Sequence, residues 1–137
     1  MKRTSVNPWE WGLPLSLDQG ELIEGVTTHL HCSGQVAVAP APETEMGFTV
    51  LHPNEIRGQM EATLANVDAV LTAGGMDRSN ILSIRFFTTD VDGFLENYDV
   101  YASWIAEAGT RPPQSLLGVS RLVLPDLVVE IEVVAGA

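Results

Sequence analysis

The chain has 137 residues, of which 45% are hydrophobic and 18% are charged. A chain of this length and composition can bury enough apolar surface for one core, so we expect a single domain over residues 1–137. Seven Lys and Arg residues stand against eighteen Asp and Glu residues. The resulting net charge of −11 argues against binding to nucleic acids or to anionic membranes.

The cysteine count and the first residues indicate the compartment. Cys32 is the only cysteine, so no intramolecular disulfide can form. The N-terminus carries Lys2 and Arg3 without the apolar stretch of a secretory signal, and no run approaches the length of a membrane span. We therefore expect a cytoplasmic protein.

The N-terminal third predicts short strands and loops. Pro8, Trp9, Trp11 and other turn-forming residues in the first fifteen positions disfavour a helix and predict an irregular arm that lies over the body. Residues 21–24 and 28–35 predict two strands that pair with one another. The stretch 39–49 contains prolines and a glycine, which predicts a long loop.

The middle of the chain predicts two helices around a strand. Apolar residues recur at three- and four-residue steps from Asn54 to Ala73, which predicts an amphipathic helix capped by Asn54 and closed by the glycine pair that follows. A strand is predicted at 81–89. A second helix is predicted to begin at Asp90 or Asp92 and to end at Gly109.

The C-terminal part predicts two more strands, at 115–122 and 127–135. In the last strand the odd positions are all apolar, whereas the even positions include Glu130 and Glu132. The element order suits an α+β domain in which both helices pack on one face of the sheet. The opposite face then carries two acids beside valines, and we expect another subunit to cover it.

Three groups of residues have side chains that could form a chemical site. Glu130 and Glu132 could together hold or activate a water molecule, or could be two solvated acids on an exposed edge. His29 and His31 share a strand face, but a third ligand at suitable spacing is not evident, and no metal site is predicted. Cys32 is interpreted as a buried, inert thiol.

Several segments taken together resemble the Rid/YjgF family of reactive-intermediate deaminases, and the resemblance covers nearly the whole chain. The matching segments are Cys-Ser-Gly-Gln at 32–35, Leu-Ala-Asn-Val at 64–67, Ala-Gly-Gly-Met at 73–76, Thr-Asp-Val-Asp at 89–92, Asn97, and Val-Glu-Ile-Glu at 129–132. No single segment is diagnostic, but their order and spacing are specific.

The resemblance implies a chorismate-mutase-like fold and a homotrimer whose sheets form a central barrel, with three clefts between subunits. In the best-studied branch of the family, a cleft arginine pairs with the carboxylate of a 2-imino acid. A glutamate then helps water to hydrolyse the imine to a 2-keto acid and ammonia, without a metal or an organic cofactor. Here the glutamate corresponds to Glu130, the family's helix asparagine to Asn97, and its Ser-Gly pair to Ser33 and Gly34.

Two positions depart from the family pattern. Gln114 stands where the family has its cleft arginine, and Leu17 stands where it has a tyrosine, so the chain resembles a branch that lacks the cleft arginine. A neutral amide cannot form the paired charge-assisted hydrogen bonds that a guanidinium gives to a carboxylate. Arg111 is the candidate replacement in the cleft, and Arg85 is a further one.

The sequence is compatible with three functions. The first is a homotrimer that binds a small metabolite and hydrolyses an imine or enamine that lacks the usual carboxylate, with Glu130 activating water. Ser33, Gly34, Asn97, Gln114 and Arg111 are the expected ligand-binding residues. The second is a non-catalytic module that senses a metabolite or regulates a partner. The third, an endoribonuclease or translation inhibitor, is disfavoured by the acidic charge.

Overall fold

A mixed five-stranded sheet forms the centre of the molecule in the computed structural model, which describes residues 1–137. Its strands run in the order β3, β9, β7, β8, and β4 also pairs with β9. Strands β7 and β8 are parallel, and the other pairs are antiparallel. The strands are β3 (His29–His31), β4 (Gln35–Val36), β7 (Ile81–Thr88), β8 (Gln114–Gly118) and β9 (Val129–Gly136).

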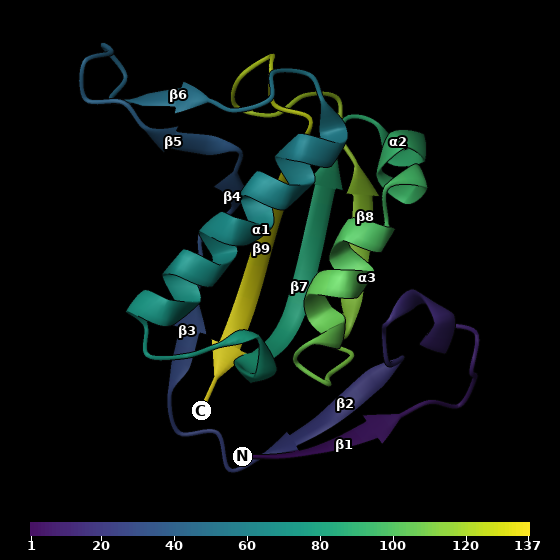
Figure 1. Cartoon of the computed structure of the whole chain (residues 1–137). Helices are drawn as coiled ribbons and strands as arrows, with labels where there is room; N and C mark the ends of the chain where they lie inside the picture. Colours follow the sequence, from purple (N-terminus) through teal and green to yellow (C-terminus); the bar gives the residue numbers. More distant parts are fainter.

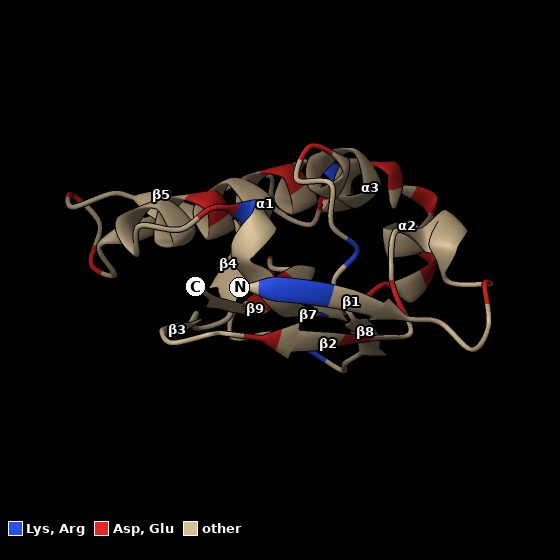
Figure 2. Cartoon of the chain, turned by 90° about the horizontal axis from the view of Figure 1, so that it is seen from below, with Lys and Arg blue, Asp and Glu red and all other residues tan.

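The helices pack against one face of this sheet, as predicted (Figure 1). They are α1 (Ile56–Ala73), α2 (Val91–Glu96) and α3 (Asp99–Ala106). Figure 2, seen from below, shows the helical layer above the strands and no element over the opposite face of the sheet. The fold is therefore α+β, with one face of the sheet covered within the chain and the other open.

The predicted second helix is two helices, so the expectation of two helices in all was wrong. The break falls at Asn97 and Tyr98, between α2 and α3. The Asn97 amide Nδ2 donates to the carbonyl of Gly93 at 2.8 Å and so takes up an acceptor in the last turn of α2. The predicted start at Asp90 is confirmed, because its carboxylate accepts from the Gly93 amide.

The ends of α1 correct one prediction and confirm another. Asn54 has a left-handed backbone (φ 58°) and does not cap the helix. The cap is Glu55, whose side chain accepts from the amide of Gly58. At the other end, Gly74 and Gly75 follow Ala73, and Gly75 adopts the left-handed conformation (φ 73°) that commonly closes a helix.

The core lies between the sheet and the helices and confirms the alternation predicted for the last strand. Val129, Ile131, Val133 and Ala135 of β9 are buried, whereas Glu130, Glu132 and Val134 are only partly buried. Helix α1 contributes a stripe of buried side chains, Met60, Leu64, Val67 and Leu71. Phe86 packs against Phe94 and Tyr101 under the α2–α3 break.

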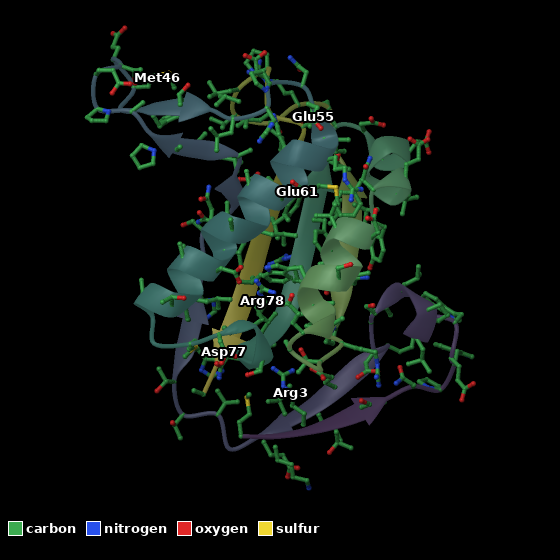
Figure 3. The ribbon with its side chains drawn as sticks, viewed as in Figure 1. Arg3, Met46, Glu55, Glu61, Asp77 and Arg78 are labelled. Carbon is green, nitrogen blue, oxygen red and sulfur yellow. The ribbon has the colours of Figure 1, made fainter.

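Two hairpins outside the main sheet were not predicted. Strand β1 (Lys2–Val6) pairs with β2 (Gly20–Glu24), so the N-terminal arm is not irregular throughout, and β2 does not pair with residues 28–35. Strands β5 (Val38–Pro40) and β6 (Phe48–Val50) pair within the predicted loop. The second hairpin reaches away from the body and carries Met46 near its tip (Figure 3). Strand β8 is also shorter than expected and ends at Gly118.

Polar contacts fix the N-terminal hairpin to the body. Buried Asp18 accepts hydrogen bonds from Ser5 at 2.6 Å, Asn7 at 2.7 Å and the Arg111 guanidinium at 3.0 Å. Burial raises the pKa of Asp18, but these donors outweigh burial and hold the pKa below its ordinary value. On β1, Arg3 donates to the Ser79 carbonyl at 2.8 Å (Figure 3).

The two tryptophans of the arm face outward. Trp9 is 63% exposed and Trp11 is 62% exposed, so these two side chains do not pack on the body of the chain. They precede a short 3₁₀ helix (Leu13–Leu15) within the loop that joins β1 to β2. Among all helices of the chain, none is both long and apolar enough to cross a membrane.

Candidate functional site

The open face of the sheet carries a charged cluster on two adjacent strands. The register places Arg85 opposite Glu132 and Phe87 opposite Glu130. The Arg85 guanidinium Nε lies 2.7 Å from Oε1 of Glu132. This ion pair gives Glu132 a cationic partner and leaves Glu130 as the carboxylate without one.

Glu130 lies beside a break in the strand that runs along β9. Residues 32–34 separate β3 from β4, and Gly34 sits at this break. A methyl group on Gly34 would stand 2.7 Å from Cδ of Glu130, which means that only glycine permits so close an approach. The backbone of Gly34 therefore forms one wall against the Glu130 carboxylate.

The surroundings of Glu130 raise the pKa of its carboxyl group. Burial, and then the neighbouring charge of Glu132, raise the pKa of Glu130 above its ordinary value. A carboxylate with a raised pKa binds a proton more readily near neutral pH than a solvated one does. Glu130 is therefore the acid of this pair that is both partly buried and without a cationic partner.

A shallow cavity of about 150 Å³ opens beside the ion pair. Its lining includes His31, Cys32, Ser83, Arg85 and Glu132. Cys32 is only partly buried, so the expectation of a buried thiol was wrong, although partial burial still raises the pKa of the thiol and keeps it protonated. We call Gly34, Arg85, Glu130 and Glu132 the acid half-site.

Gln114 lies on the opposite face of the sheet. It is the register partner of Ile84, which is buried under the helices. Its amide Nε2 donates to the Tyr98 hydroxyl, and that hydroxyl donates to the Leu15 carbonyl at 2.6 Å. Burial raises the pKa of Tyr98, so the hydroxyl stays protonated and remains a donor. We call Tyr98, Gln114 and the Leu15 carbonyl the amide half-site.

The other predicted site residues have partners of their own. Asn97 binds the Gly93 carbonyl and accepts from the Arg57 guanidinium at 3.3 Å, directly before Tyr98 in the chain. Arg111 pairs with Asp18 at the base of the arm. The Ser33 carbonyl accepts from the Gln35 amide at 3.1 Å.

The predicted site residues thus form two groups. Gly34 and Glu130 lie together on the open face, whereas Gln114 and Asn97 lie on the helix side, and no contact within the chain joins the groups. Sequence reasoning missed Tyr98 and the Leu15 carbonyl. Gln114 shares its strand face with Leu116, but Leu117 on the opposite face is apolar as well, so the alternation on this short strand carried no signal for the face of Gln114.

The histidines do not form part of a larger cluster. The ring centroids of His29 and His31 are 6.3 Å apart. The structure contains no group of three or more His, Cys, Asp or Glu side chains placed to hold a metal ion.

Comparisons with known proteins point to one family. The family model described as Endoribonuclease L-PSP matches residues 21–137. A RutC family protein of Aquifex aeolicus is 32% identical over 110 residues, which cover 80% of this chain and 82% of that protein. TdcF of Escherichia coli, named as a candidate reactive intermediate deaminase, is 30% identical over 119 residues, covering 85% of this chain and 86% of that protein.

Solved structures show the same fold. The Rid-family protein YyfB of Yersinia pestis superposes with a TM-score of 0.82 over 100% of both chains, at 23% identity. The structure of Escherichia coli TdcF with bound serine has a TM-score of 0.66 and 28% identity, and the match covers 97% of this chain and 91% of that one. The chain therefore shares both sequence and architecture with these proteins.

Proposed function

Because the chain belongs to the Endoribonuclease L-PSP family, the family of the Rid/YjgF proteins, we propose that it is a homotrimer that binds a small metabolite between subunits and hydrolyses an imine or enamine there. The proposal covers the whole of residues 1–137 as one domain that acts in the cytoplasm. The deaminase name of TdcF supports the reaction class, and its bound serine supports a small ligand.

The observation that carries the proposal is the placement of the two half-sites on opposite faces of one sheet. Glu130 lies on the open face and Gln114 on the helix face, at the edge strand β8. Copies that associate head to tail bring two different surface patches of neighbouring chains together, and a closed ring repeats that contact at every interface. The acid half-site of one copy then meets the amide half-site of the next.

The open face also has the composition of an interface. Phe87 and Val134 are only partly buried, and Leu117 is 40% exposed. Apolar side chains of this size beside a charged cluster are typical of a surface that another protein surface covers. Packing the open face against a second copy removes these side chains from water.

Glu130 is the residue we assign to proton transfer. Its carboxylate takes a proton from water, and the water oxygen bonds to the carbon of the C=N group. That proton passes from Glu130 to the nitrogen and gives a carbinolamine. Glu130 then takes the hydroxyl proton of the carbinolamine and delivers it to the nitrogen as the C–N bond breaks, so that an imine and water yield a carbonyl compound and ammonia. Water and a carboxylate suffice for this reaction, so the proposal assigns no metal or organic cofactor.

The substrate we propose lacks the carboxylate of a 2-imino acid. Gln114 provides a neutral amide that is already bound to Tyr98, and Arg111 is paired with Asp18. Neither residue offers a free guanidinium, and a charge-assisted pair is worth about twice a neutral hydrogen bond. Ser33, Gly34 and Asn97 are assigned to positioning the ligand within the cleft.

The test compares ammonia release by the wild type with that of Glu130→Gln on freshly generated imines. Removing a general base lowers the rate by about 100-fold or more. Glu132→Gln is the matched control, because it changes the other acid of the same strand and leaves Glu130 in place. Equal rates in the wild type and Glu130→Gln would remove Glu130 from the mechanism, and a monomer by light scattering would remove the cleft.

A second candidate function follows from the hydrogen bonds that Gln114 makes within the chain. The Gln114 amide binds Tyr98 and the arm, so it can hold the arm in place instead of a substrate, which favours a non-catalytic metabolite sensor. Thermal stabilisation by a metabolite without product formation would support the sensor. The nuclease activity in the family description is disfavoured by the net charge of −11.

A further inference from the structure

We propose that Trp9 and Trp11 form an aromatic wall of the inter-subunit cleft and select protonated imines that carry a planar apolar group. This inference rests on the proposed function for the existence of the cleft. It goes further by naming the residues that choose the substrate and the chemical class that they choose.

The first support is the combination of exposure and fixed position. The two indole rings are 63% and 62% exposed and lie two residues apart, and a large exposed apolar patch often marks a binding site. The arm that carries them is held at both ends. Asp18 binds Ser5, Asn7 and Arg111, and the Asp18 amide donates to the Arg111 carbonyl at 2.9 Å.

The second support is the position of the arm relative to the amide half-site. The Leu15 carbonyl, four residues after Trp11, accepts from the Tyr98 hydroxyl that also binds Gln114. Leu13 and Leu15 are 37% and 41% exposed, so the loop adds further apolar surface beside Gln114. The loop that carries the tryptophans therefore contacts the amide half-site through Leu15.

The third support is the charge of the surroundings. Residues 7–19 contain no Lys or Arg, and their exposed acid is Glu10, because Asp18 is buried and paired with Arg111. The acid half-site adds Glu130 and Glu132, of which only Glu132 has a cationic partner. The cations nearest the two half-sites, Arg111 and Arg85, are each paired with a carboxylate. A protonated imine would meet the unpaired carboxylate of Glu130 and the negative faces of two indole rings.

These observations define the ligand class. An indole face attracts a cation and packs on a flat apolar group, and Gln114 provides only neutral hydrogen bonds. The substrate is therefore a protonated imine with an aromatic or similarly flat apolar substituent and no carboxylate. The acid half-site supplies the base for its hydrolysis, and the arm supplies the contact that selects it.

Binding of stable analogues tests the inference without requiring turnover. Benzamidine has the ring and the planar cationic C=N group of such an imine, acetamidine lacks the ring, and benzoate reverses the charge. Calorimetry should show benzamidine binding to the wild type about 10-fold more tightly than acetamidine, and benzoate should not bind. The variant Trp9→Leu/Trp11→Leu, which keeps apolar bulk, should lose that 10-fold advantage.

Leu22→Ala is the matched control, because Leu22 is 61% exposed on β2 of the same hairpin and lies outside the proposed wall. It should bind benzamidine as the wild type does. Equal benzamidine affinity in the wild type and the double variant would overturn the inference. So would tighter binding of benzoate than of benzamidine.

Turnover and assembly separate this inference from the proposed function. Ammonia release is compared for an aromatic imine generated from 1-phenylethylamine by an amine oxidase and for 2-iminopropanoate generated from alanine by an amino-acid oxidase. Benzamidine binding that depends on the tryptophans, without any turnover, would leave the inference standing and reject the hydrolase. Turnover of 2-iminopropanoate that depends on Glu130 but not on the tryptophans would reject the inference and keep the hydrolase, with a substrate that carries a carboxylate.

Light scattering of the double variant completes the test. The aromatic wall predicts an assembly of unchanged mass with an altered preference between ligands. A double variant that falls apart into single chains, and whose remaining assembly shows the wild-type preference, would assign the tryptophans to subunit contact alone and overturn the inference.

Discussion

The last strand, β9, and the N-terminal arm are held in place by different forces. In β9 the side chains of Val129, Ile131 and Val133 are no more than 1% exposed and fix the strand by apolar burial. In the arm the large apolar side chains point outward, and the buried anchor is the carboxylate of Asp18. Apolar burial thus positions Glu130, whereas a few polar contacts position the tryptophans.

Removing apolar contacts from β9 is the change with the largest expected effect on the free energy of unfolding. Ile131 is fully buried against α1 and β7, and Ile131→Ala deletes three carbons and leaves a cavity. We expect the free energy of unfolding to fall by about 3 to 4 kcal/mol, measured by urea denaturation. Val134→Ala, on the open face of the same strand, should cost clearly less, and an equal cost would contradict the one-sided core.

The same contrast explains which features the sequence could predict. The alternation in β9 and the three- and four-residue spacing in α1 are repeated signals, and both elements were placed within two residues of their observed ends. The arm depends on Asp18 meeting Arg111, 93 residues away, and no local pattern reports such a pair. The pairing of β2 with β1 was missed for the same reason.

The candidate site was predictable to a similar degree. The strand period placed Glu130 on the open face correctly. Gln114 follows two prolines on a strand of only five residues, too short to show which face it presents. The break at Asn97 that brings Tyr98 toward Gln114 depends on a side-chain contact with Gly93, which apolar spacing does not report.

A smaller effect is expected from releasing the arm. Asp18→Ala leaves Ser5, Asn7 and Arg111 without their shared acceptor, and we expect a loss of about 2 to 3 kcal/mol in the free energy of unfolding at neutral pH. Because the pKa of Asp18 lies below its ordinary value, this contribution is present above the unfolded pKa and disappears as the pH falls through the folded pKa. The wild type and the variant should therefore converge in acid.

Local proteolysis reports whether the loss is confined to the arm. Asp18→Ala should be cleaved within residues 7–19 faster than the wild type, while hydrogen exchange in β9 stays slow. Glu24→Ala is the control on the same hairpin, because its ion pair with Lys2 is exposed and surface pairs contribute little. Equal cleavage of both variants would show that Asp18 is not the anchor.

The smallest effect concerns Glu130, where burial works against the charge. Burial and the charge of Glu132 raise the pKa of Glu130 in the folded protein above its ordinary value. Between those two values the folded state holds more protons than the unfolded state, so stability falls as the pH rises through that window and stays lower above it.

Glu130→Gln removes the charge and should raise the melting temperature at pH 7, and the gain should vanish below about pH 4, where the carboxyl is protonated in both states. Glu132→Gln should show no such gain, because it breaks the ion pair with Arg85. A more stable but inactive Glu130→Gln would mean that the strand holds Glu130 ready for proton transfer at the expense of stability, whereas a melting temperature unchanged across this pH range would mean that the carboxylate is fully solvated.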